Sequence, residues 1–133
     1  MRKGPLARTM RPRRRPRPTH EAALELAIAA CLERKAVGGV VLDLHGISDA
    51  TDQFVIVSGT SDTHVRAIAE HVIEQLREAD VRPYQVEGLS QGRWVVVDYV
   101  DFVVHVFHPT LRSFYQLEVL WGDAPQRPLP SQP

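Results

Sequence analysis

The strongest constraint on the fold is a break in composition near residue 20. Eight of the sixteen Lys and Arg residues lie in residues 1–20 together with four prolines, whereas all sixteen Asp and Glu residues lie beyond them. A segment so charged and so poor in apolar side chains cannot bury enough surface to offset the entropy of ordering its backbone. We therefore expect a disordered basic arm over residues 1–18.

The opposite end of the chain is also unusual, because residues 125–133 contain four prolines. We expect a disordered proline-rich tail there. Residues 19–124 then remain as one folded domain, a normal size for a single core.

The net charge of zero hides an uneven distribution. Residues 21–133 hold eight Lys and Arg against sixteen Asp and Glu, which is a net charge of −8. Phosphate contacts need Lys and Arg, so an acidic folded body favours a basic protein over nucleic acid as its partner. The basic arm remains open to two interpretations, a contact to RNA or a solvated tail.

Cysteine content and apolar runs bear on the compartment. Cys31 is the only cysteine and falls on the apolar side of a predicted helix, so we expect a buried thiol in a reducing environment. No apolar run approaches the roughly 18 residues that cross a bilayer, and the N-terminus lacks the apolar core of a secretory signal. These features predict a cytoplasmic protein without a membrane segment, and an organelle transit peptide in the Arg-rich, acid-free arm is the minor alternative.

Three segments show helical periodicity. The first has Thr19 as its N-cap and ends at Gly38-Gly39, and the second is capped by Ser61 or Asp62 and ends before Pro83. The third begins near Pro109, where a first helical turn accepts proline. The predicted apolar stripes are Leu24, Ala27, Ile28, Cys31 and Leu32; then Val65, Ile68, Ala69, Val72 and Leu76; then Leu111, Phe114, Leu117 and Trp121.

Short runs of β-branched and aromatic residues predict strands over residues 40–44, 54–57, 84–87, 93–98 and 102–107, the last two as a hairpin. The order of elements indicates an α/β (α+β) domain with a mixed sheet of about five strands and three helices. Several strands are apolar on both faces. This leaves two possibilities, a partly uncovered apolar face that serves for docking, or a face covered by the first helix.

The segment Ser58-Gly59-Thr60-Ser61-Asp62 is the best signal for an enzyme, because small residues at a helix N-terminus can bind phosphate. No Asp-x-Asp pair follows to hold Mg²⁺, which phosphoryl chemistry needs. A helix cap with a tight turn is therefore the favoured interpretation. A nucleotidyltransferase-like, nucleotide-binding enzyme is the alternative.

The histidines do not predict a metal site. His105 and His108 are three apart on a strand and point to opposite faces, and His64 and His71 are two helical turns apart. We expect no metal, no cofactor and no catalytic residues, and we interpret His105 as a hydrogen-bonded structural residue.

The motifs, taken together and in order, resemble the Iojap family of ribosomal silencing factors over about residues 21–124. They are TDQFVIVSGTS (residues 51–61), AIA (67–69), EG (87–88), WVVVDY (94–99), VVHVF (103–107) and RSFYQLEVLW (112–121). The resemblance implies a nucleotidyltransferase-like fold without nucleotidyltransferase chemistry. It also implies binding to the large ribosomal subunit through ribosomal protein fourteen, which sterically blocks joining of the small subunit and represses translation.

The resemblance also implies a docking surface formed by the strand of Trp94 and the hairpin of Tyr99, Val100 and Asp101. Trp94 is interpreted as an interface anchor or as a core residue, while Asp101 and Glu87 are contacts for a basic partner or turn residues. Family members usually have Gly where Val100 stands, so we expect a looser turn here. A homodimer through the same apolar sheet remains open.

Overall fold

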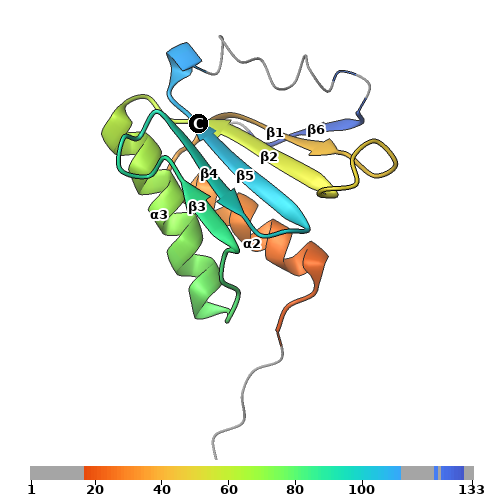
Figure 1. The fold of residues 1–133 in the computed structure, drawn as a ribbon. Coiled ribbons are helices and arrows are strands. Elements are labelled where there is room, and N and C mark those ends of the chain that lie inside the picture. The colour runs from red at the N-terminus through yellow and green to blue at the C-terminus, as the bar shows by residue number, and fades with distance from the viewer. Residues whose placement is uncertain (1–16, 112–121, 123, 131–133) are drawn as a thin grey trace, which may run out of the picture.

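The computed structural model describes residues 17–111, 122 and 124–130, which form two helices and a six-stranded sheet (Figure 1). Residues 109–111 are also helical, and the rest of the third predicted helix lies outside the described residues. Neither α2 nor α3 has the length and apolar character needed to cross a membrane. The elements are α2 (His20–Glu33), β1 (Val37–Asp43), β2 (Gln53–Ser58), α3 (Asp62–Glu78), β3 (Gln85–Glu87), β4 (Trp94–Asp98), β5 (Phe102–Phe107) and β6 (Gln126–Pro128).

The sheet has the strand order β3-β4-β5-β2-β1-β6. Only β2 and β5 pair in parallel, and the other neighbours are antiparallel. The parallel pair is possible because α3, β3 and β4 carry the chain from the end of β2 back to the start of β5. The structure thus confirms a mixed sheet in an α+β domain, with the hairpin of β4 and β5 as predicted.

The sixth strand corrects the prediction of a disordered tail, which is wrong for Gln126–Pro128. β6 pairs with β1, the Asp43 N–H donates to the Pro125 carbonyl at 2.9 Å, and the Leu129 N–H donates to the Gly39 carbonyl at 2.9 Å. Proline is compatible with this position because β6 is an edge strand, where a missing N–H costs no ladder bond. The side chain of Leu129, directly after β6, is buried in the core. The tail therefore buries apolar surface, which its composition alone did not indicate.

Helices α2 and α3 pack side by side on one face of the sheet (Figure 1). The Thr19 side chain caps α2 by accepting from the Ala22 N–H at 3.1 Å, and Ser61 caps α3 by accepting from the His64 N–H at 3.1 Å. The apolar stripe of α3 is buried as predicted. Cys31 is also buried, and burial raises the pKa of its thiol to about 12, so the thiol is uncharged.

The first helix ends earlier than predicted, at Glu33. Lys35 follows with a positive φ of 61°, and Gly38 and Gly39 lie within β1, where the register with β2 shifts. A β-bulge tolerates glycine readily, so the glycine pair marks this irregular strand start and not the end of the helix.

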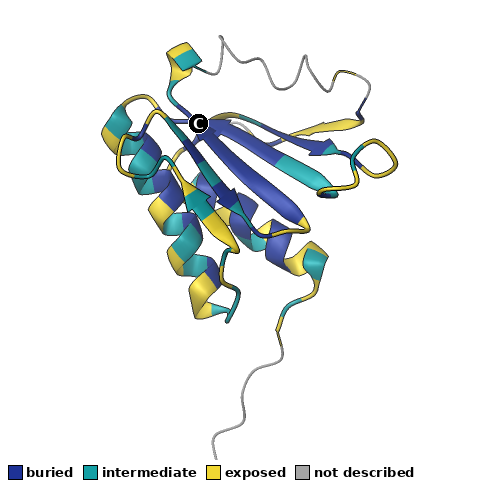
Figure 2. Ribbon diagram, viewed as in Figure 1, coloured by how far each residue is buried: buried dark blue, intermediate teal, exposed yellow. Residues whose placement is uncertain are grey.

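The second face of the sheet carries its own apolar cluster. Leu42, Ile56 and Phe107 are fully buried there together with Ala124, and Leu111 packs against this cluster. Figure 2 shows the strands in the middle of the sheet largely in the colour of buried residues. Helix α2 does not cover this face, because it lies with α3 on the other one (Figure 1). Of the two alternatives, cover by the first helix is thus wrong, and an uncovered apolar face is wrong for the strands in the middle of the sheet, whose side chains on this face are buried.

Candidate partner-binding surface

The five candidate residues do not form one patch. Trp94 begins β4 and Asp101 follows its other end, so the two residues are separated by the length of this strand, about 13 Å at the usual rise per residue. Glu87 pairs with Val96 and so shares the second face with Trp94, whereas Tyr99 belongs to the core on the helix side. Val100 and Asp101 form the exposed tip of the hairpin.

Trp94 is held firmly on the second face. Its ring stacks on Phe107 at a centroid distance of 5.0 Å, and its Nε1–H donates to Nδ1 of His105 at 3.1 Å. The residue is half-buried, so part of its surface remains available. Trp94 is thus both a packed residue and a pre-oriented aromatic side chain at the sheet surface.

His105 has the structural role that the sequence predicted. It pairs with Val96 across the hairpin, is 6% exposed, and lies edge-on to Phe54 at 4.5 Å. Burial lowers the pKa of His105 to about 4. The ring is therefore neutral near pH 7, with Nδ1 free to accept the indole hydrogen bond.

Tyr99 is 8% exposed and stacks on Phe102 at 5.1 Å. Burial raises the pKa of its hydroxyl, which stays protonated. Among the described residues, Tyr99 Oη has no hydrogen-bond partner. The Tyr99 side chain is therefore not available as a contact on the outer surface, and it lines a pocket instead.

The turn at Val100 is tight, which corrects the expectation of a looser turn. Val100 has a φ of 74°, and the Asp101 N–H donates to the Tyr99 carbonyl at 2.9 Å, as in a γ-turn. The Val100 N–H in turn donates to Asp98 Oδ1 at 2.8 Å. The hydrogen bonds of the turn hold a β-branched residue in a backbone conformation that such residues rarely adopt.

Two carboxylates are exposed near this hairpin. The Asp101 side chain is 62% exposed and its Oδ2 lies 3.8 Å from His20 Nδ1. Glu87, on the edge strand β3, accepts a hydrogen bond from the Gln85 side-chain amide. Both carboxylates can meet a cation of a partner, as the sequence analysis proposed.

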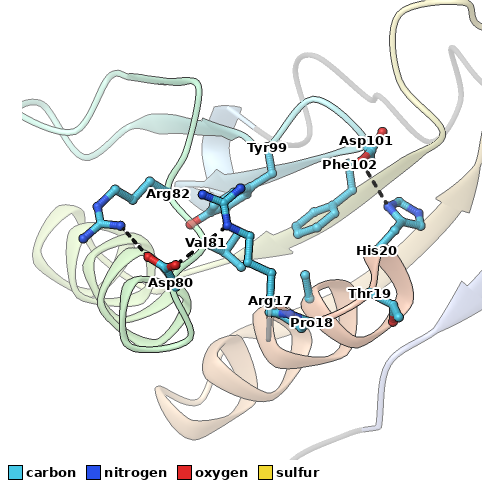
Figure 3. A pocket seen from close by; sticks show the side chains of 11 residues that line it. Arg17, Pro18, Thr19, His20, Asp80, Val81, Arg82, Tyr99, Asp101 and Phe102 are labelled. Carbon is cyan, nitrogen blue, oxygen red and sulfur yellow. Dashed lines mark hydrogen bonds and ion pairs between the residues drawn. The ribbon is translucent and has the colours of Figure 1, made fainter. Parts of the chain in front are cut away.

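A pocket of about 340 Å³ lies between the N-terminus of α2, the end of α3 and the hairpin, and we call it the α2–hairpin pocket (Figure 3). The sequence alone did not predict this pocket. Its charged and polar lining comes from three segments far apart in the chain, so no local spacing could have revealed it. These polar side chains are Arg17, Thr19, His20, Asp80, Arg82, Tyr99 and Asp101.

The turn proposed for the enzyme alternative uses its polar groups internally. Ser61 caps α3, and the Thr60 N–H donates to His64 Nδ1 at 2.8 Å. A Cβ added at Gly59 would lie 2.8 Å from the Val65 backbone nitrogen, so the glycine is needed for packing against α3. The described residues contain no group of three His, Cys, Asp or Glu side chains that could hold a metal ion. The geometry of the turn favours a helix cap.

A family model described as ribosomal silencing factor during starvation matches residues 17–133 of the chain. The ribosomal silencing factor RsfS of Bacillus subtilis is 46% identical over 105 residues, which cover 79% of this chain and 89% of that protein. The chloroplastic Iojap protein of Zea mays is 32% identical over 113 residues, which cover 81% of this chain and 46% of that protein.

Two solved structures share the fold. A crystal structure of a protein from Chromobacterium violaceum has a TM-score of 0.75 at 35% identity and covers 77% of this chain and 85% of that one. A Bacillus halodurans protein has a TM-score of 0.73 at 39% identity and covers 81% of this chain and 98% of that one. The motif order, the mixed sheet and these similarities agree, and the chain therefore belongs to the ribosomal silencing factors, the Iojap family.

Proposed function

We propose that the chain binds the large ribosomal subunit through ribosomal protein fourteen and thereby sterically prevents the small subunit from joining. The binding surface is the β4–β5 hairpin with the adjoining second face, and no catalytic step is involved. A cytoplasmic location follows from this role. The observation that carries the proposal is an acidic hairpin tip held rigidly on an acidic folded body.

Charge supports a basic protein as the partner. The body after residue 20 has a net charge of −8, and the Asp101 carboxylate projects from it with 62% of its side chain exposed. Complementary charges speed association and orient the partners, even where each exposed ion pair adds little affinity. Asp101 therefore selects and orients a cationic partner surface.

Rigidity supports the hairpin as the contact. Interfaces gain affinity when the contacting groups need little ordering on binding. The turn at Val100 is held by the Asp98 side chain, and Trp94 is held by Phe107 and His105. Half-buried aromatic side chains of this kind commonly serve as anchors.

Asp101→Lys tests the contact, and Glu70→Lys on the exposed side of α3 is the control with the same change in net charge. Asp101→Lys is expected to weaken binding to purified large subunits at least roughly tenfold, because a like charge then faces the partner. Glu70→Lys is expected to change it by less than about threefold. Cosedimentation with large subunits through a sucrose cushion measures both.

Inhibition of joining is tested separately, by adding small subunits to large subunits preincubated with the chain. The sedimentation profile is expected to show separate subunits, with joined ribosomes returning when the Asp101→Lys chain is used. Normal joining in the presence of saturating wild-type chain would refute steric exclusion. Equal binding by the wild type, Asp101→Lys and Trp94→Ala chains would move the interface elsewhere.

A further inference from the structure

The Lys and Arg side chains of the described residues divide into those with and those without an ion pair. The pairs are Arg17 and Arg82 with Asp80, Arg77 with Glu74, and Arg127 with Glu25. The four cations that form no ion pair with a described carboxylate are Arg34, Lys35, Arg66 and Arg93. Unpaired cations are unexpected here, because residues 21–133 hold sixteen carboxylates against eight cations.

These four cations lie at one end of the molecule, which we call the basic end. His64 Nε2, in the first turn of α3, lies 2.7 Å from the carbonyl oxygen of Arg34, the residue that follows α2. Arg66 Nη1, also on α3, lies 3.5 Å from the carbonyl oxygen of Ser90, in the loop that Arg93 ends. Figure 1 shows the start of α3 and this loop at the upper left, and the turn of the β4–β5 hairpin at the lower right. The basic end and the hairpin turn are therefore at opposite ends of the sheet.

Two carboxylates border the basic end, and both face histidines. Glu33 Oε1 lies 2.6 Å from His71 Nε2. Asp62 Oδ1 lies 3.8 Å from His108 Nε2. Neither carboxylate neutralises one of the four cations, so the positive charge of this end is available to a partner.

Local stability explains only part of this arrangement. The dipole of α2 favours cations after its C-terminus, which accounts for Arg34 and Lys35. Gly92 packs against the start of α3, because a Cβ added there would lie 2.5 Å from the carbonyl oxygen of the first residue of this helix. Arg66 and Arg93 thus lie beside the start of α3, where the helix dipole disfavours cations. Their position is favourable only when an anion is nearby.

We propose that the basic end contacts the phosphate backbone of RNA on the large ribosomal subunit, while the acidic hairpin at the other end contacts the basic ribosomal protein. This inference rests on the proposed function and adds a second partner to it. An RNA phosphate suits exposed cations that need not break an ion pair first, and the surface of a ribosomal subunit supplies many phosphates. Opposite charges at the two ends also set the orientation of the docked chain, because a reversed chain would place like charges together.

Two double variants test the contact. Arg34→Gln/Arg93→Gln alters the basic end, and Arg77→Gln/Arg127→Gln removes the same two charges from paired arginines elsewhere; all four side chains are exposed. The first variant is expected to weaken binding to large subunits roughly tenfold at low salt, and to lower the slope of log affinity against log salt by about 1 to 2. The control is expected to stay within about twofold of the wild type. Cosedimentation over a series of salt concentrations measures both.

The isolated ribosomal protein fourteen, which carries no RNA, shows whether the contact is to RNA. Arg34→Gln/Arg93→Gln and Arg77→Gln/Arg127→Gln are expected to bind this protein with equal affinity. Weaker binding by the first variant would assign the basic end to a protein contact and overturn the proposal.

A short RNA duplex tests the basic end without the ribosome. It is titrated into the full-length chain, with a polyglutamate peptide as the control anion. Amide chemical shifts of Lys35, Thr63 and Arg93 are expected to move with the duplex, and to saturate at roughly tenfold higher RNA concentration in Arg34→Gln/Arg93→Gln than in the control variant. The basic arm is present in every chain, so it does not cause this difference. Equal saturation in both variants, or equal shifts with polyglutamate, would overturn the proposal.

The outcomes separate the two proposals. If the wild-type chain does not bind large subunits, the proposed function fails, and the titration with the RNA duplex still decides the basic end. If the wild type binds, and the two double variants bind with the same affinity and the same salt slope, the proposal for the basic end fails and the function stands.

Discussion

Val100 is the residue with the clearest backbone strain in the described part of the chain. A β-branched residue at a φ of 74° costs about 1 to 3 kcal/mol, which the neighbouring contacts must offset. The residue is 53% exposed, so packing contributes little in return. Such strain at an exposed tip is consistent with a side chain kept for contact with a partner.

Val100→Gly is therefore expected to stabilise the free chain by about 1 kcal/mol, since glycine adopts a positive φ without strain. The midpoint of urea unfolding measures the change. The same variant is expected to bind large subunits more weakly if the valine side chain touches the partner. A Val100→Gly chain that is less stable than the wild type would show that the turn is not strained.

The neutral His105 predicts how stability depends on pH. In the unfolded chain a histidine titrates near pH 6.5, while burial lowers the pKa of folded His105 to about 4. Between these values only the unfolded chain takes up the proton, so stability is full above about pH 6.5 and falls as the pH drops toward 4. The total loss is about 3 kcal/mol.

His105→Gln is expected to remove most of this loss, while the exposed His45→Gln control retains it. Unfolding by urea at pH 7.5 and pH 4.5 measures the difference. An unchanged decline in the His105→Gln chain would show that other groups cause the acid sensitivity.

At the scale of elements, β6 covers the outer edge of β1. Its three residues are exposed, but Leu129 directly after it is 8% exposed and packs against Gly39, where a Cβ would come within 2.4 Å of Leu129 Cδ1. The ion pair between Arg127 and Glu25 at 3.0 Å is exposed on both sides. The strand is therefore held by one apolar side chain and its backbone bonds more than by charge.

Leu129→Ala is accordingly expected to destabilise the chain by about 2 kcal/mol through lost burial and a residual cavity. Arg127→Gln, which removes the exposed ion pair, is expected to cost less than about 1 kcal/mol. Thermal unfolding followed by circular dichroism compares the two. A larger effect of Arg127→Gln would mean that charge, and not burial, attaches this strand.

At the scale of the whole molecule, charge is divided between two parts of the chain. Residues 17–133 hold nine Lys and Arg against sixteen Asp and Glu, so removing residues 1–16 changes the net charge from zero to −7. The family model also begins at residue 17, so residues 1–16 of the arm lie outside the matched region. These residues therefore change the net charge of the chain without belonging to the part that matches the family.

Deleting residues 1–16 is expected to speed association with the isolated basic ribosomal protein by roughly tenfold or less at low salt, because electrostatic attraction is no longer offset. The advantage is expected to shrink at about 0.5 M salt, where charges are screened over a few ångströms. Stopped-flow fluorescence from the tryptophans measures the rate. Slower association of the shortened chain at low salt would contradict this prediction.

The sequence alone determined the features that depend on local periodicity and capping. The stripes of α2 and α3, the caps Thr19 and Ser61, the hairpin of β4 and β5 and the structural role of His105 all followed from spacing and side-chain chemistry. The family membership followed from the order of motifs. These features were predictable because each is set by residues close together in the chain.

Tertiary structure decided what depends on contacts between distant segments. It made a strand of Gln126–Pro128, because the β1 edge offers backbone bonds and a place for Leu129 that no proline count reveals. It buried Tyr99 and placed it with Arg17, His20 and Asp80 in the lining of one pocket, although Arg17 and Tyr99 lie 82 positions apart in the chain. Composition and periodicity describe a segment's own preferences, whereas the partner that satisfies a strand edge or a buried hydroxyl is set only when the chain packs.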